Sequence, residues 1–298
     1  MPRISVCITH YNRPHKLAAT LESLARQTRL PDEVFLRDDC SPNDPATVAL
    51  NFKNRFPSFT YQRNPQNLNM PGNLNAVIKQ ATGDYIATLH DADTYHPQLL
   101  EKWERALDDH PTAGFVFCGV ENRFENPART PEVHLHSIRP LTPGKEFFVT
   151  HYVGSLSSPV WGTIMARRDA YELLGPFDPS YGPWADVDMW MRMCNRFDVA
   201  YVREALMFLD MGDSEWRKFT WEKKLLHDAM VTTNIRRIFA HDLATMRGHL
   251  RKQRSYFRQR YFRLLLGRIW HRDWEQICAG LALFGRLFFR PSESELSS

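Results

Sequence analysis

The chain has 298 residues, of which 43% are hydrophobic and 24% are charged. This length predicts about two domains and allows a core that needs no disulfide or metal staple. The five cysteines are scattered and never spaced as CxxC, which argues against a disulfide scaffold, a zinc ribbon and a thioredoxin motif. We find no apolar region typical of a signal peptide or a membrane-spanning helix. We therefore expect a reducing compartment, the cytoplasm.

Positive charge is concentrated near the C-terminus. Residues 247–290 contain 11 Lys+Arg and 2 Asp+Glu, which gives +9, although the whole chain carries only +4. A basic segment joined to a mildly acidic body suggests an anionic partner for that segment, such as a membrane, a nucleic acid or another protein.

Short apolar runs alternate with helical periods along the first 120 residues. The runs predict strands at 4–8, 33–37, 59–62, 85–89 and 114–120. The helical periods predict helices at 14–24, 45–56, 73–81 and 97–107. This alternation is typical of right-handed βαβ units and a largely parallel sheet, in which ligands bind beyond the carboxyl ends of the strands.

The second half of the chain is less regular. Residues 121–158 show no clear period and predict a long excursion that faces substrate. A helix is expected at 187–195, and two strands are expected at 199–202 and 206–209. From residue 216 the pattern is helical almost to residue 289.

An acidic pair, Asp91 and Asp93, directly follows the strand at 85–89. Two carboxylates with one residue between them can present oxygens to a divalent cation, and Mg²⁺ typically uses few carboxylates together with substrate phosphates. Such a cation would neutralise the charge that develops on a diphosphate leaving group. The alternative is a solvated turn.

Two further polar groups follow the first two strands. Asp38 and Asp39 could accept a hydrogen bond from a base or a sugar hydroxyl, or they could form an Asx turn. Tyr11, with Thr9 nearby, could stack on a nucleobase or simply cap its strand.

A third acidic pair, Asp186 and Asp188, lies at the start of a predicted helix between Trp184 and Trp190. The helix dipole favours an ionised carboxylate there. Asp186 could serve as a general base, which needs only hydrogen-bond reach to an acceptor hydroxyl, or it could be an N-cap.

Taken together, these segments resemble a family 2 glycosyltransferase with the GT-A fold over about residues 3–210. The family's PTYNR, VDDGS, ARN, LDADD and EDxDLWLR motifs correspond in order to residues 8–13, 36–41, 67–83, 89–94 and 185–192. The resemblance implies a Rossmann-like α/β domain, a mixed and mostly parallel sheet with helices on both faces. To this domain we add a C-terminal helical extension.

The resemblance also implies a role for each matching residue. Donor binding would involve a group of polar and aromatic side chains: Thr9, Tyr11, Arg13, Asp39, Asn73 and Asp91. Asp93, with Asp91, would bind Mg²⁺ or Mn²⁺, and Asp186 would be the catalytic base. Trp161, Trp184 and Asp188 would contact the acceptor or the sugar.

Four positions depart from the family pattern. Cys40 stands in place of Gly, Leu74 in place of Arg, Thr94 in place of Asp and Ala185 in place of Glu. These changes bear on the choice of donor and on activity, whereas the three acids assigned to the chemistry are retained.

We expect a catalytic domain at 1–215, a basic amphipathic helical extension at 216–290 and a flexible tail at 291–298. Arginines alternate with aromatic residues and leucines over 247–290, which is typical of a helix at an anionic membrane surface. The alternative is packing on the catalytic domain or on a second subunit. Nucleic acid is not an expected partner, because no basic groove or known module accompanies the segment.

The predicted function is a metal-dependent, inverting glycosyltransferase in the cytoplasm, peripheral on the inner face of the membrane. It would transfer a sugar from a nucleotide-diphosphate sugar, a UDP-sugar by preference, to a glycan or lipid-linked acceptor in surface polysaccharide biosynthesis. Two alternatives are a nucleotidyltransferase and a non-catalytic nucleotide- or sugar-binding scaffold.

Overall fold

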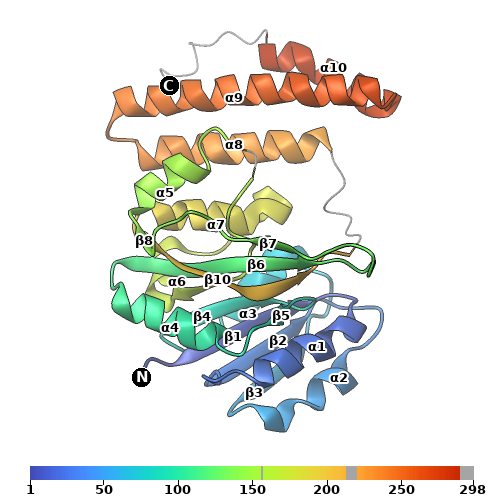
Figure 1. The fold of residues 1–298 in the computed structure, drawn as a ribbon, viewed down its shortest axis with the longest axis vertical. Helices are drawn as coiled ribbons and strands as arrows, with labels where there is room; N and C mark the ends of the chain where they lie inside the picture. The colour runs from blue at the N-terminus through green and yellow to red at the C-terminus, as the bar shows by residue number, and fades with distance from the viewer. Residues whose placement is uncertain (156, 213–219, 289–298) are drawn as a thin grey trace. The chain divides into compact units, whose positions relative to one another are not determined.

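The computed structural model describes residues 1–155, 157–212 and 220–288 (Figure 1). Internal contacts divide the chain into two compact units. The first comprises Met1–Tyr152 and Ser157–Glu215, and the second comprises Val153–Leu156 and Trp216–Ser298. The tail predicted at 291–298 lies outside the described residues.

A ten-stranded mixed sheet forms the centre of the first unit (Figure 1). Its main path runs β3-β2-β1-β4-β9-β6-β10-β5, with β7 paired to β6 and β8 paired to β10. The strands are β1 Ile4–His10, β2 Glu33–Asp38, β3 Phe59–Arg63, β4 Tyr85–His90, β5 Thr94–Tyr95, β6 Ala113–Arg123, β7 Glu132–His134, β8 Leu141–Thr142, β9 Ile164–Arg167 and β10 Asp198–Asp210. β1 is parallel to β2 and β4, β2 to β3, and β6 to β10, whereas β9 is antiparallel to both of its neighbours. The predicted mixed, mostly parallel sheet is confirmed.

Helices cover both faces of this sheet. They are α1 Pro14–Ala25, α2 Ala46–Leu50, α3 Asn69–Ile78, α4 Leu99–Asp109, α5 Gly144–His151, α6 Arg168–Leu174 and α7 Ala185–Cys194, with short 3-10 helices at Lys53–Arg55 and Pro179–Trp184. Neighbouring residues of β6 show the two faces, because successive side chains of a strand point in opposite directions. Val116 belongs to the core cluster that includes Leu21 of α1 and Trp103 of α4. Phe115 packs instead on Trp190 of α7, with 5.7 Å between the ring centroids.

The structure differs from the sequence-based expectation in several segments. The helix expected at 45–56 is a short α-helix, α2, followed by a separate 3-10 helix at Lys53–Arg55. The two strands expected after residue 198 are one strand, β10, whose register shifts between Val202 and Met207 at irregularities. The excursion at 121–158 contains β7, β8 and α5. Helix α3 begins at Asn69, four residues earlier than expected, with Pro71 in its first turn, where a proline is tolerated.

The second unit is helical and has its own small core. Its helices are α8 Trp221–Ile238, α9 Leu243–Trp270 and α10 Trp274–Phe288. Trp221 packs on Tyr261 with 4.9 Å between ring centroids, and its Nε1 donates a 2.7 Å hydrogen bond to the carbonyl of Gln276. A Cβ on Gly280 would lie 2.9 Å from the Trp221 ring, so the close approach of α10 depends on this glycine. Among the described residues, none of the helices combines the length and the apolar character needed to cross a bilayer.

A partly buried carboxylate in this unit predicts an unusual dependence of stability on pH. Burial raises the pKa of Asp228 to about 6, although Gln253 donates a 2.8 Å hydrogen bond to it and Arg254 lies nearby. The unfolded chain releases this proton near pH 4, so the native state is destabilised as the pH rises from about 4 through 6. We expect Asp228→Asn to raise the free energy of unfolding of this unit by ~2 kcal/mol at pH 7.5.

Urea unfolding followed by circular dichroism at pH 4 and pH 7.5 measures this effect. The gain should largely disappear at pH 4, where Asp228 is protonated in the native state and about half protonated in the unfolded chain. Glu222→Gln, an exposed change on the same helix, serves as the control. An equal gain for the two variants, or a gain that persists at pH 4, would contradict the account.

Candidate active site

Three parallel strands of the first unit end side by side. In the register of the sheet, His10 of β1 lies opposite Asp38 of β2, and Thr9 lies opposite His90 of β4. The polar segments that follow β1, β2 and β4 therefore meet at one edge of the sheet. This is the edge at which α/β sheets bind ligands.

The carboxylate of Asp91 is buried and fully engaged by its neighbours. His10 Nδ1 lies 2.8 Å from Oδ2, the backbone N–H of Tyr11 donates to Oδ2 at 3.2 Å, and Arg13 donates to Oδ1 at 3.2 Å. Burial tends to raise the pKa of Asp91, but the hydrogen bond from His10 and the charge of Arg13 outweigh it and the pKa is lowered. Asp91 is thus an ionised anchor that joins the β4 end to the loop after β1.

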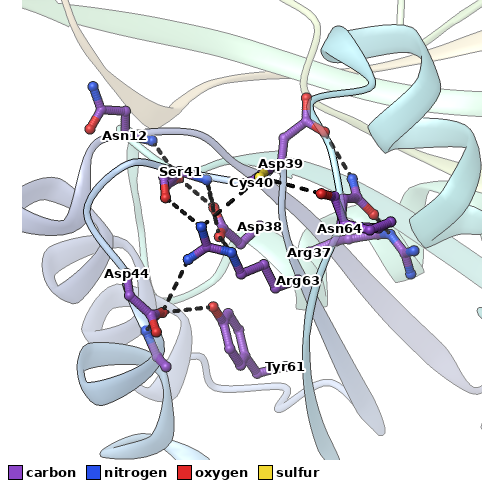
Figure 2. Close-up of polar contacts among 12 residues, drawn as sticks. Asn12, Arg37, Asp38, Asp39, Cys40, Ser41, Asp44, Tyr61, Arg63 and Asn64 are labelled. Atoms are coloured by element: carbon purple, nitrogen blue, oxygen red, sulfur yellow. Dashed lines mark hydrogen bonds and ion pairs between the residues drawn. The ribbon is translucent and has the colours of Figure 1, made fainter.

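The side chain of Asp39 is held in a buried amide network (Figure 2). Its Oδ1 accepts hydrogen bonds from Asn64 Nδ2 and from the backbone N–H of Leu68, both at 2.8 Å. Asn64 also donates to Asn73 Oδ1 at 2.9 Å, and Asn73 donates to the carbonyl of Arg37 at 3.1 Å. Asn73, predicted as a donor contact, therefore fixes Asn64, which in turn fixes Asp39.

The turn after β2 has a left-handed backbone conformation at Cys40, the position where the family pattern has glycine. Cys40 has a φ of 61°, and Asn12 in the facing loop has a φ of 56°. The backbone N–H of Asn12 donates to Ser41 Oγ at 2.8 Å, Ser41 bonds the buried Asp38 carboxylate, and Arg63 donates to the Ser41 carbonyl at 2.8 Å (Figure 2). These bonds hold the left-handed conformation that a side chain at position 40 disfavours.

We expect Cys40→Gly to stabilise the first unit by about 0.5–1 kcal/mol, because relief of the left-handed strain exceeds the added entropy of glycine in the unfolded chain. Cys40→Ala keeps the Cβ and its strain and should give no gain. Urea denaturation of both variants measures the difference. A gain from alanine alone would instead point to the thiol contacts.

The catalytic candidates come together around Gly162. A Cβ on Gly162, whose φ is 81°, would lie 2.8 Å from Asp186 Oδ2 and 2.9 Å from Cε1 of His90. His90 Nδ1 in turn lies 3.4 Å from Oδ2 of Asp93. One imidazole thus links the carboxylate at the start of α7 to the second carboxylate after β4, so the structure brings Asp93 and Asp186 to one place.

The charges in this group shift two pKa values upward. The side chain of His90 is 46% exposed, and the partial loss of solvent lowers its pKa less than the carboxylates of Asp93, Asp186 and Asp91 raise it. Desolvation raises the pKa of Asp186, against a 2.7 Å hydrogen bond from the N–H of Val187 and the charge of His90. A carboxylate with a raised pKa is a better proton acceptor, as a general base requires.

A cavity of about 260 Å³ is lined in part by Ala92 and Thr94, the residues that flank Asp93 in the sequence. The N–H of Asp210 donates to Asp93 Oδ1 at 3.2 Å, and the Asp210 carboxylate pairs with Lys16 at 2.8 Å. Lys16 also pairs with Glu125 at 3.2 Å. The cavity lining mixes charged and aromatic side chains, among them Lys16, Arg123, Phe124, Glu125, Phe208 and Asp210.

The residues fit a divalent cation only in part. Across the described ranges, no group of three or more His, Cys, Asp or Glu side chains could hold a metal ion. Both oxygens of Asp91 already have hydrogen-bond partners, and its role as a metal ligand stays a prediction. Asp93 has one backbone donor on Oδ1 and His90 near Oδ2, which leaves it able to bind a cation whose other ligands are water and substrate phosphates.

The remaining donor candidates lie around the end of β1. Thr9 is half-buried in the strand, and the side chains of Tyr11 and Arg13 are about half exposed. Their positions leave the Tyr11 ring and part of the Arg13 guanidinium open to a ligand at this edge.

The residues predicted to contact the acceptor or the sugar differ in how they are placed in the structure. Trp161 precedes Gly162 and packs on the ring of His134, with 5.5 Å between centroids, and Trp184 immediately precedes α7. Asp188, in contrast, is 1% exposed and pairs with Arg192 at 2.8 Å. Its carboxylate is buried in this ion pair and is not accessible to an acceptor.

Sequence reasoning missed four residues of the site: His10, Asn64, His90 and Gly162. His10 and His90 end the two strands whose motifs were recognised, and their position directly before or within these motifs was the available signal. Gly162 and Asn64 carried no local signal, because their roles depend on contacts with residues distant in sequence.

Residues 5–174 match the model of the family described as Glycosyl transferase family 2. The chain belongs to this family. A Haemophilus influenzae protein named as a glycosyltransferase is 31% identical over 114 residues, which is 38% of this chain and 37% of that protein. EpsE of Bacillus subtilis, also named as a glycosyltransferase, is 26% identical over 226 residues, which is 74% of this chain and 78% of EpsE.

Solved structures share the fold. The crystal structure of Staphylococcus aureus TarS residues 1–349 with UDP-GlcNAc has a TM-score of 0.63 and 15% identity, covering 95% of this chain and 92% of that one. The corresponding complex with UDP has a TM-score of 0.61 and 17% identity, covering 78% of this chain and 65% of that one. The predicted family and the GT-A fold are thus confirmed.

Proposed function

We propose that this glycosyltransferase inverts the anomeric centre of a nucleotide-diphosphate sugar, with a UDP-sugar as the preferred donor, and transfers the sugar to a hydroxyl of a glycan or lipid-linked acceptor. The proposal rests above all on the meeting of Asp186, His90 and Asp93 around Gly162. The structures of TarS with UDP and UDP-GlcNAc add support for this class of donor.

The nucleotide binds where the loops after β1 and β2 meet. Tyr11 supplies an exposed ring for stacking on the base, and Asp39 supplies an acceptor for a base N–H, since only its Oδ1 is engaged within the described chain. Arg13 faces solvent next to Asp91 and is placed to meet phosphate.

The transfer is a single displacement. The acceptor O–H gives its proton to Asp186, and the acceptor oxygen forms a bond to the anomeric carbon as the bond from that carbon to the diphosphate oxygen breaks. The products are the extended acceptor, with inverted configuration, and the nucleoside diphosphate. Trp161, beside Gly162, and Trp184, beside α7, offer aromatic surface to the sugars.

Asp93 would hold Mg²⁺ or Mn²⁺ together with the phosphates of the donor. When bound, the cation neutralises the negative charge that grows on the leaving diphosphate. His90, next to Asp93 and Asp186, keeps the two carboxylates apart and compensates part of their charge. The glycan formed would belong to surface polysaccharide biosynthesis.

Release of nucleoside diphosphate from a panel of nucleotide sugars tests this function, with Mg²⁺, with Mn²⁺ and with a chelator. We expect Asp93→Asn to lower kcat/KM for the donor by ~10²-fold, in line with the several kcal/mol that a bound cation contributes. Asp169→Asn, an exposed acid on α6, is the matched control.

Three results would overturn the proposal. A folded protein that binds donors and never turns them over with any acceptor would be a scaffold. Release of pyrophosphate from a nucleoside triphosphate and a sugar phosphate would indicate a nucleotidyltransferase. Full activity in the chelator would remove the metal from the mechanism.

A further inference from the structure

The turn between α9 and α10 carries a concentration of exposed apolar side chains. Trp270 is 84% exposed and Trp274 is 70% exposed, the two highest values for any tryptophan in the described chain. The neighbouring exposed apolar residues are Phe262, Leu266, Ile269 and Leu281. Large apolar groups gathered in one place on a surface indicate an interaction site.

These residues follow helical spacing on each helix. On α9, Phe262, Leu266, Ile269 and Trp270 stand at positions i, i+4, i+7 and i+8 and so form one stripe. The stripe is separate from the buried face of α9, which includes Tyr261 and Leu265.

The same spacing recurs on α10. Trp274, Cys278 and Leu281 stand at i, i+4 and i+7, and all three are exposed. Ile277 and Gly280, between them, are buried. Both helices thus carry an apolar stripe that begins or ends at the turn, and we call the two stripes together the hairpin tip.

The turn itself is well defined. Arg272 has a φ of 54°, Arg268 pairs with Asp273 at 3.1 Å, and Asp273 accepts a hydrogen bond from the N–H of Gln276 at 3.3 Å. These contacts hold Trp270 and Trp274 on either side of a defined turn. Binding through the tip therefore requires little loss of conformational entropy in the turn.

Positive charge surrounds the tip. Residues 247–272 contain nine Lys+Arg and no Asp or Glu. Most of these cations are exposed along α9 and at the turn: Arg251, Lys252, Arg254, Arg258, Arg260, Arg263 and Arg272. Two acids follow, Asp273, which pairs with Arg268, and the exposed Glu275, so the surface combines aromatic and aliphatic groups with an excess of cations.

We propose that the hairpin tip docks on the surface of an anionic lipid bilayer. Tryptophans and leucines enter the boundary between headgroups and acyl chains, and the arginines pair with lipid phosphates. The docking is interfacial, consistent with the finding that no described helix can span a bilayer. The proposed partner of the basic segment is thus a lipid surface, and this proposal does not depend on the sugar transfer proposed for the edge of the sheet.

Charge decides between a bilayer and a second copy of the chain. A symmetric dimer through the tip would bring two sets of arginines together, because the same patch faces itself across a two-fold axis. An anionic bilayer attracts each cation near its surface, and it accepts tryptophan at the depth where the ring is buried and its N–H remains hydrated.

Sedimentation with vesicles tests the docking on the full chain. We expect binding to vesicles of phosphatidylcholine and phosphatidylglycerol, and much weaker binding to phosphatidylcholine alone. Arg263→Gln and Arg272→Gln should each weaken binding about five-fold. Trp270→Ser combined with Trp274→Ser should weaken it by at least about ten-fold.

Exposed residues of the first unit provide matched controls. Arg105→Gln and Leu173→Ser remove a cation and an apolar group that are exposed on α4 and α6, and they should leave binding unchanged. Donor turnover in solution should be unchanged in the tip variants, so failure of the docking and failure of the proposed function can be told apart.

Cys278 provides a second readout, because it is exposed within the α10 stripe whereas Cys7, Cys118 and Cys194 are buried. In a Cys40→Ser background, an environment-sensitive dye on Cys278 should shift to the blue on anionic vesicles. No binding at low salt, or equal losses in the controls, would overturn the proposal. A dimer in solution that the tryptophan variants dissociate would instead assign the tip to a second copy.

Discussion

Replacing Asp186 by Asn is expected to lower kcat by about 10²–10⁴-fold, the usual contribution of a general base. Asn keeps the size of the side chain and can still accept the hydrogen bond from the N–H of Val187, so α7 should begin as before. Donor affinity should change little, because the role proposed for Asp186 is toward the acceptor. Initial rates with saturating donor, together with a binding measurement for the nucleoside diphosphate, check both parts.

The pH profile distinguishes a base from a merely structural carboxylate. Desolvation raises the pKa of Asp186, and the base must be deprotonated to accept a proton, so kcat/KM should rise with pH through a value above the ordinary carboxyl pKa of about 4. This acidic limb should be absent from the residual activity of Asp186→Asn.

Two control variants sharpen the result. Asp169→Asn, on the surface of α6, should keep the wild-type rate and profile. Asp188→Asn should reduce stability, because it breaks a buried pair with Arg192, and should keep the acidic limb. An unchanged rate for Asp186→Asn would remove the base from the mechanism.

Much of the first unit could be predicted because its strands are buried runs that end in polar segments. The strands at 4–8 and 85–89 and the polar residues after them were found where the structure has them. The contact between His10 and Asp91, however, spans 81 residues and depends on the register of β1 against β4, which no local pattern reveals.

Other differences have local causes. Two exposed charged residues, Arg203 and Glu204, interrupt the apolar pattern of β10. The sequence pattern therefore predicted a turn there, although the strand continues past it with irregular register. The long helical pattern after residue 216 is broken at Asp242, which caps α9 through the N–H of Thr245, and at Asp273, just before α10. Asp is a common helix cap, so these two breaks had a signal in the sequence.

In the site, too, local sequence patterns do not reveal contacts between residues that are distant in sequence. The three acids assigned to the chemistry could be named from motifs, but their neighbours decide what each can do. His10 and Arg13 occupy Asp91, whereas Asp93 and Asp186 remain available around His90. A motif therefore predicts which carboxylates are present, whereas the hydrogen-bond partners of each depend on how the strand ends pack together.

Gly162→Ala is expected to lower kcat by about 10²-fold, because displacement of a reacting group by about 1 Å can have this effect. The new methyl would lie 2.8 Å from Asp186 Oδ2 and 2.9 Å from Cε1 of His90, so both side chains must move. The positive φ of 81° adds a strain of about 1–2 kcal/mol to the folded state. Rates and unfolding free energies should be measured on the same preparations.

Gly175→Ala separates the two effects, since Gly175 also has a positive φ, 74°, but no atom lies within 4 Å of its added Cβ. Both variants should lose stability from backbone strain, and only Gly162→Ala should lose activity. If the two variants lost activity equally, strain rather than displacement would be the cause. If Gly162→Ala kept the wild-type rate, the spacing between Asp186 and His90 would not matter for transfer, and the link through His90 to Asp93 would be structural only.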